Sequence, residues 1–157
     1  MSEIIQYTND DGVKIIIKKE ISQSLPEFYF ETYFENGKAI CEKQYENGEL
    51  NNVSFYAYSH DEMESILKDK KGNVSIIFIY YEKSYKITEN LVFRENSIVG
   101  KTIMVQDQNE DLICFKKFEL ENSGLVCTVT DKSFYENGVE KFAFIYNKDN
   151  RFYLGWI

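Results

Sequence analysis

Three short stretches decide how this chain folds: FENG at 34–37, YENG at 45–48 and YENG at 135–138. Each one places an aromatic residue and a glutamate before the dipeptide Asn-Gly. Asn-Gly between apolar segments favours a two-residue type I′ turn, because both central residues of that turn need a positive φ. The sequence therefore predicts a β-hairpin at each of the three places.

The segments around these turns have the pattern of β-strands. Residues 27–34 alternate, with Phe28 and Phe30 on one side and Tyr29 and Glu31 on the other. From Val74 to the end of the chain, strand-like segments recur about every 10 to 13 residues with turn-forming residues between them. This spacing predicts a large, twisted antiparallel meander of hairpins. It leaves open whether the sheet is open or closes into a sandwich or barrel.

One short helix interrupts the strands. Ser59 and Glu62 have the spacing of a capping box, and Met63 and Ile66 follow at helical intervals. Gly72 is a natural helix end. We expect a helix near residues 60–71, and an α+β fold that is predominantly β, in one domain spanning residues 1–157.

Composition restricts the class of partner. The 157 residues carry a formal net charge of −8, and 43% of them are hydrophobic, as in globular proteins. A nucleic-acid-binding protein needs basic surface to neutralise phosphates, so we expect no nucleic-acid partner. An acidic protein is better suited to a basic partner.

The N-terminus and the cysteines indicate a reducing compartment. Residues 1–5 have neither the basic nor the long apolar region of a signal peptide, and no apolar run is long enough for a membrane helix. The cysteines Cys41, Cys114 and Cys127 are odd in number and scattered, which does not suit a disulfide framework. We expect a cytoplasmic protein with no membrane association.

We find no pattern of catalytic or metal-binding residues in the sequence. The single histidine, His60, lies in the predicted capping box, and the cysteines lie between apolar strand residues. Zinc-ligand spacing, phosphate-binding glycine loops and nucleophile elbows are all absent from the sequence. We therefore predict a non-enzymatic protein without a cofactor or metal. A carboxylate pair for glycoside hydrolysis is the enzymatic alternative, although none of the 26 acidic residues is singled out.

Residues 28–59 resemble the MORN-variant repeat of bacterial antitoxin and immunity-type proteins. The stretch from Tyr33 to Lys38, YFENGK, is followed after an eleven-residue step by Tyr45 to Gly48. Residues 134–147 are similar to half of such a repeat. The resemblance implies a hairpin scaffold with protein-binding or antitoxin-like associations, and it implies no catalytic residues.

The turns also predict which side chains share a face. If the turn at Asn36-Gly37 contains two residues, Glu31 lies opposite Glu42, and the turn at Asn47-Gly48 places Glu46 opposite Glu49. Like charges directly opposite one another destabilise a sheet, so we interpret this face as a surface for a cationic partner. A bulge would shift this register. The predicted partner-binding residues are Tyr29, Glu31, Tyr33, Glu42, Glu46 and Glu49.

From these observations we expect a protein-binding domain, namely an immunity protein or antitoxin that neutralises a basic bacterial toxin. One alternative is a small-molecule or lipid carrier with aromatic residues around the mouth of a curved sheet. Another is a structural or adaptor module, including a homo-oligomer, that pairs through an exposed sheet edge.

Overall fold

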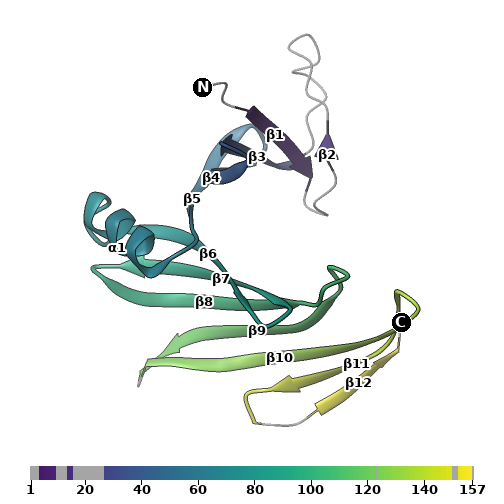
Figure 1. Ribbon diagram of the computed structural model, residues 1–157. Helices are drawn as coiled ribbons and strands as arrows, with labels where there is room; N and C mark the ends of the chain where they lie inside the picture. Colours follow the sequence, from purple (N-terminus) through teal and green to yellow (C-terminus); the bar gives the residue numbers. More distant parts are fainter. Residues whose placement is uncertain (1–3, 10–13, 16–26, 123, 150–151, 157) are drawn as a thin grey trace. The chain divides into compact units, whose positions relative to one another are not determined.

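The computed structural model describes residues 4–9, 14–15, 27–122, 124–149 and 152–156 (Figure 1). The described residues are predominantly β with one short helix, which confirms the predicted fold class. They group into two compact units, residues 1–56 and 57–157. The single domain expected from the sequence stays a prediction.

The first unit is a small antiparallel sheet. Its strands are β1 (Ile4–Asn9), β2 (Lys14–Ile15), β3 (Phe28–Glu35), β4 (Lys38–Glu46) and β5 (Glu49–Ala57), in which Ala57 already belongs to the second unit. Their spatial order is β5-β4-β3-β1-β2. Strand β1, which the sequence did not predict, lies between β3 and β2. The strand order in this sheet therefore differs from the order along the chain.

All three Asn-Gly turns form where they are predicted. Asn36, Asn47 and Asn137 have φ values of 50°, 50° and 52°, and the glycines that follow have φ values of 77°, 79° and 74°. Both central residues of each turn are therefore left-handed, as a type I′ turn requires. Each hairpin also contains a β-bulge close to its turn, where the strand register shifts.

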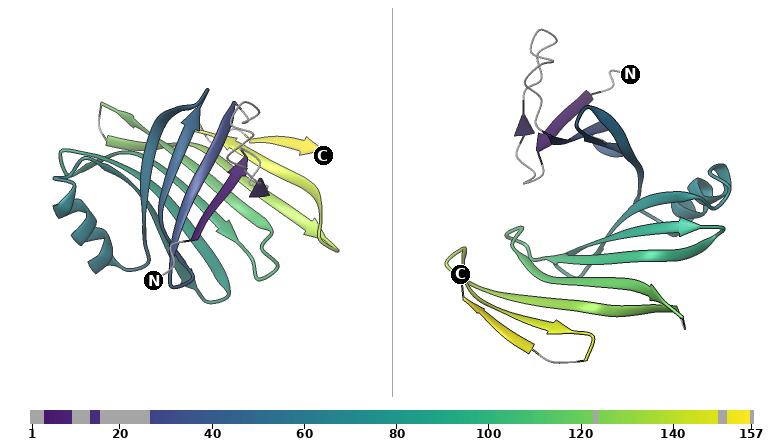
Figure 2. Two further views of the ribbon diagram at one scale, coloured as in Figure 1. Left: turned by 90° about the horizontal axis from the view of Figure 1, so that it is seen from above. Right: turned by 180° about the vertical axis from the view of Figure 1, so that it is seen from behind.

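The second unit contains α1 (His60–Asp69) and seven strands. These strands are β6 (Val74–Glu82), β7 (Tyr85–Arg94), β8 (Ser97–Gln106), β9 (Leu112–Glu121), β10 (Gly124–Glu136), β11 (Val139–Asn147) and β12 (Phe152–Trp156). Each strand pairs antiparallel with the next one along the chain. Figure 2 shows the resulting curved sheet, with α1 beside β6.

The apolar core of the second unit is concentrated on β6 and β7. Ile76, Ile77 and Phe78 are buried in succession, so β6 is covered on both faces as its continuous apolar sequence predicts. Leu91 and Phe93 are buried on the neighbouring strand. Ile76 is only 1% exposed, which makes it the best buried large side chain of the described residues.

Helix α1 is capped at both ends. The Ser59 hydroxyl accepts a hydrogen bond from the Glu62 amide at 3.2 Å, and the Glu62 carboxylate accepts one from the Tyr58 amide at 2.7 Å. At the other end, Gly72 has a φ of 72°, and its carbonyl accepts from the Asn96 amide at 3.1 Å. A Cβ on Gly72 would lie 2.6 Å from that amide nitrogen. The helix end is therefore held against the β7–β8 turn.

Candidate functional site

A bulge in the β3–β4 hairpin changes the predicted surface. Tyr33 pairs with Cys41 rather than with Ile40, because Ile40 is the extra residue of the bulge. Every pair beyond the bulge is shifted by one residue. Glu31 therefore lies opposite Lys43, and the predicted repulsion between Glu31 and a glutamate on β4 is wrong.

The six predicted residues consequently divide between two faces of the sheet. A shift of one residue moves every side chain of a strand to the other face. Glu42 pairs with Thr32, and Glu46 pairs with both Phe28 and Glu49. One face holds Tyr29, Glu31 and Tyr33, while the opposite face holds Glu42, Glu46 and Glu49.

The first of these faces carries a compact group of aromatic and charged side chains, which we call the tyrosine cluster. Its members are Tyr7, Tyr29, Glu31, Tyr33, Lys43 and Tyr45. Tyr29 and Tyr45 stack in parallel, with ring centroids 4.9 Å apart and an interplanar angle of 6°. Tyr7 lies on β1 directly opposite Glu31. The three members on β3 were predicted from the sequence. The members on β1 and β4 were not, because their positions depend on the pairing of β1 and on the bulge.

The charges of the tyrosine cluster are paired internally. Lys43 Nζ donates to the Tyr33 hydroxyl at 3.2 Å and lies 3.9 Å from Glu31 Oε1. The Tyr33 hydroxyl in turn donates to Glu31 Oε1. The Glu31 side chain is 14% exposed and that of Lys43 is 34% exposed. This face is therefore close to neutral and does not have the uncompensated acidity that a cationic partner would recognise.

The same contacts raise several pKa values. Hydrogen bonding to Glu31 is the main cause of the raised pKa of Tyr33, and burial is the main cause for Tyr7 and Tyr29. The pKa of Lys43 is raised chiefly by its hydrogen bond with Tyr33. The phenols therefore stay protonated and the lysine stays charged at neutral pH.

On the opposite face, Glu42 is a partly buried carboxylate. Tyr56 donates a hydrogen bond to its Oε2 at 3.0 Å, and Thr32 donates another. Burial raises the pKa of Glu42, and this effect outweighs the two hydrogen bonds, which lower it. A carboxylate enclosed in this way is a structural group of the sheet and is poorly placed to meet a partner protein.

The β4–β5 turn carries the acidic pair that the sequence correctly placed in register. Glu46 lies directly opposite Glu49, and the two residues border a shallow hollow of about 180 Å³ with Asn47, Leu50 and Asn51. Neither carboxylate forms an ion pair with any described residue. We call Glu46, Glu49 and Leu50 the acidic hairpin end. No ion pair among the described residues compensates its negative charge, in contrast to that of the tyrosine cluster.

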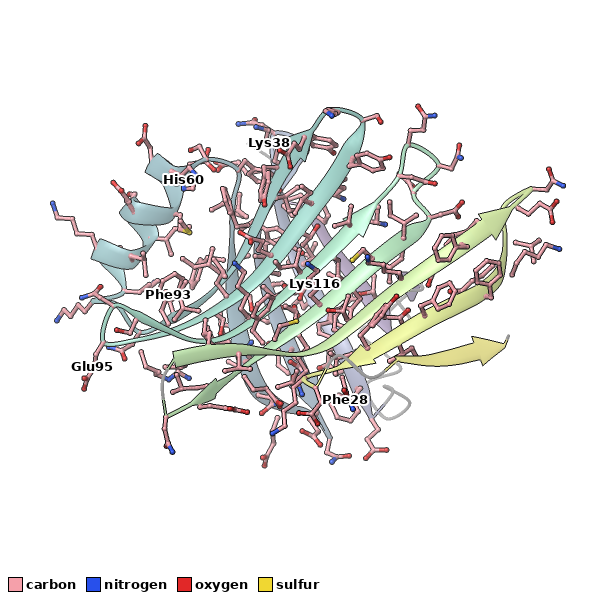
Figure 3. The ribbon with its side chains drawn as sticks, turned by 90° about the horizontal axis from the view of Figure 1, so that it is seen from below. Phe28, Lys38, His60, Phe93, Glu95 and Lys116 are labelled. Carbon is pink, nitrogen blue, oxygen red and sulfur yellow. The ribbon has the colours of Figure 1, made fainter. Side chains whose placement is uncertain are left out.

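The residues with catalytic potential are the single histidine and the three cysteines. His60 is exposed at the start of α1 (Figure 3). Its ring centroid lies 5.1 Å from that of Phe78. Cys41, Cys114 and Cys127 are free thiols, and burial raises the pKa of Cys114. Within the described part of the chain, no group of three or more histidine, cysteine or acidic side chains is arranged to hold a metal ion. We likewise find no described helix with the length and apolar character of a membrane span.

Comparisons of the chain with known protein families, with curated proteins and with solved structures find no match. The resemblance to MORN-variant repeats therefore stays a prediction from the sequence.

Proposed function

We propose that this chain is a non-catalytic protein-binding domain, and that it acts in the bacterial cytoplasm as an immunity protein or antitoxin against a basic toxin. In this proposal, a large twisted meander of hairpins is the scaffold that presents the binding surface. The observation that carries it is the acidic hairpin end, where Glu46 and Glu49 face each other without a compensating cation among the described residues.

Two further features support a basic partner. The formal net charge of −8 gives the chain a negative field that favours encounter with a cationic protein. Exposed Leu50 beside the acidic pair offers apolar contact next to the charges, a combination typical of protein interfaces. The division of the predicted residues between two faces narrows the proposed contact from six residues to Glu46, Glu49 and their neighbours.

The test starts with affinity capture from the native host. We expect the captured partner to be a basic protein that inhibits growth when expressed alone and no longer does so when this chain is co-expressed. Its affinity should fall with rising ionic strength, because exposed charges are screened. A neutral or acidic partner, or growth inhibition that persists on co-expression, would contradict the proposal.

Charge reversal locates the contact. Glu46→Lys and Glu49→Lys should each weaken binding by about 1 kcal/mol or more, because each replaces an attraction with a repulsion. Glu136→Lys is the matched control, since Glu136 occupies the same position in the third Asn-Gly hairpin but lies opposite Val139 and near Lys141. Equal losses of affinity in all three variants would show that overall charge alone drives binding.

A further inference from the structure

The second unit contains an open pocket that the proposed protein contact does not use. Its volume is about 490 Å³, within the range of small-molecule sites. It lies at the end of the sheet that carries the β6–β7, β8–β9 and β10–β11 turns, because Tyr85, Asp107 and Tyr135 border these turns. The pocket is lined by Tyr85, Asp107, Ile113, Cys114, Lys132, Ser133, Phe134 and Tyr135.

Part of its wall is an aromatic surface held in place by neighbouring rings. Phe134 stacks on Phe142 with centroids 4.8 Å apart, and it meets Phe144 edge to face at 5.6 Å. Phe142 and Phe144 are themselves in edge-to-face contact at 5.6 Å. Figure 3 shows aromatic rings gathered over β10 and β11. Although it is fixed in this way, Phe134 remains 45% exposed, so a ring surface is available to a ligand.

The adjoining side of the pocket carries one cation. Lys132 pairs in register with Cys114 on β9 and Phe144 on β11, and its Nζ lies 5.9 Å from the centroid of the Tyr146 ring. Within the described residues it forms no ion pair. A lysine ammonium among aromatic rings has a charge that a ligand anion can neutralise.

Of the remaining polar residues of the pocket, Asp107 is the one carboxylate and the others are neutral. Asp107 Oδ1 accepts hydrogen bonds from the amides of Asn109 at 2.8 Å and Asp111 at 3.0 Å, so this carboxylate organises the β8–β9 loop. The Tyr135 hydroxyl donates to the Leu112 carbonyl at 3.0 Å. Burial raises the pKa of Cys114, which keeps its thiol protonated at neutral pH.

We propose that this pocket binds a small aromatic compound carrying one negative charge, an aryl carboxylate, with its ring against Phe134 and its anion at Lys132. The aromatic wall supplies apolar contact without loss of side-chain freedom, because the rings already hold one another. The lysine selects the anion over a neutral compound of the same shape. This inference is independent of the acidic hairpin end.

Calorimetric titration of the full chain with 2-naphthoate tests the inference, with 2-naphthalenemethanol as the neutral compound of similar shape. We expect a dissociation constant of about 1 mM or tighter for the carboxylate. Lys132→Gln should weaken naphthoate binding about tenfold, since a hydrogen-bonded charge pair is lost, and should leave the alcohol unaffected. Phe134→Ala should weaken both compounds, and Phe134→Leu repeats this test if the alanine variant does not fold.

Lys148→Gln is the matched control, because Lys148 lies after β11 and is already 3.7 Å from Glu121. It should bind both compounds like the unaltered protein. The Lys132→Gln variant should bind the basic partner captured from the native host as tightly as the unaltered protein does. Failure of naphthoate to bind, or an equal effect of the two lysine substitutions, would overturn the inference. Equal binding of the acid and the alcohol with no effect of Lys132→Gln would overturn the choice of an anionic ligand.

Discussion

The β6–β7 hairpin and the three Asn-Gly hairpins all turn with two residues, but only β6–β7 keeps one register from end to end. Its nine pairs run without interruption from Glu82 opposite Tyr85 to Val74 opposite Phe93. The Asn-Gly hairpins each shift by one residue, and the extra residue is the third after the glycine every time: Ile40, Asn51 and Lys141.

The backbone of the turn accounts for this difference. In the three Asn-Gly turns both central residues have positive φ, and the same is true of Glu95 and Asn96 between β7 and β8. That fourth hairpin also has an extra residue, Val99, at the equivalent place. In the β6–β7 turn only Lys83 has a positive φ, and no bulge follows. Bulges increase local twist, so we expect the ladders that follow turns with two left-handed residues to be more twisted than the β6–β7 ladder.

The largest expected difference in stability is between a substitution in the core of the β6–β7 hairpin and a substitution at a bulge residue. Ile76→Ala should lower the free energy of unfolding by about 3 kcal/mol, because it leaves a cavity in a fully packed site. Ile40→Ala should change it by less than about 0.5 kcal/mol, since the Ile40 side chain is 39% exposed. Urea denaturation of the two variants measures the contrast, and equal losses would show that the bulge residue is as well packed as the core.

Insertion of an alanine after Ile40 tests whether the bulge sets the register. The lengthened chain could only keep its turn and a one-residue bulge by placing Glu31 opposite Glu42 and separating Tyr29 from Tyr45. We expect a loss of about 2 kcal/mol of unfolding free energy, the sum of several cross-strand pairs. Ile40→Thr keeps the residue count and serves as the control. An insertion variant as stable as the control would show that the sheet tolerates either register.

A partly buried charge in β10, the strand with a bulge on each side, should give a smaller effect. Asp131 lies between Phe115 and Ile145, and its Oδ1 is buried without a hydrogen-bond partner among the described residues. Burial, with a further contribution from Glu140, raises the pKa of Asp131. Asp131→Val should therefore stabilise the protein by about 1 kcal/mol at pH 7, because an unsatisfied polar group is removed.

The pH dependence of that variant has a definite sign. A raised pKa in the folded state means that the folded protein binds the proton more tightly, so Asp131 reduces stability as pH rises from its ordinary pKa of about 4 through the raised value. Below about pH 4 the aspartate is protonated in both states, and the advantage of Asp131→Val should shrink. Thermal unfolding at pH 3.5 and pH 7 measures this, and an advantage that grew on acidification would contradict the assignment.

The smallest effect concerns the ion pair that the bulge creates. Lys43→Gln should cost about 0.5 kcal/mol, because the Lys43–Glu31 pair is only partly shielded from water. Lys141→Gln removes a pair of nearly the same length, 3.8 Å to Glu136, in which both side chains are well exposed. That variant should be neutral within error in chemical denaturation. A larger loss of unfolding free energy in Lys141→Gln than in Lys43→Gln would contradict the expectation that shielding from water strengthens an ion pair.

Local features of the chain were predictable, while the candidate site was only partly so. The positions of the Asn-Gly turns and of α1 follow from backbone preferences and from Ser59 and Glu62, which act over a few residues. The pairing of Glu46 with Glu49 was also predictable, because it lies before the bulge. The pairing of Glu31 was not, because a single extra residue reverses the face of everything beyond it.

By itself, the amino-acid sequence determined where the three Asn-Gly turns lie, most of the strand segments, where its one described helix begins, and a net charge of −8. These properties depend on neighbouring residues and on composition. The tertiary structure decided which glutamates share a face, that Tyr7 joins the tyrosine cluster, and that Lys132 borders an aromatic pocket. Those outcomes depend on which strands pair and on bulges, because a single extra residue in one strand moves every residue beyond it to the other face.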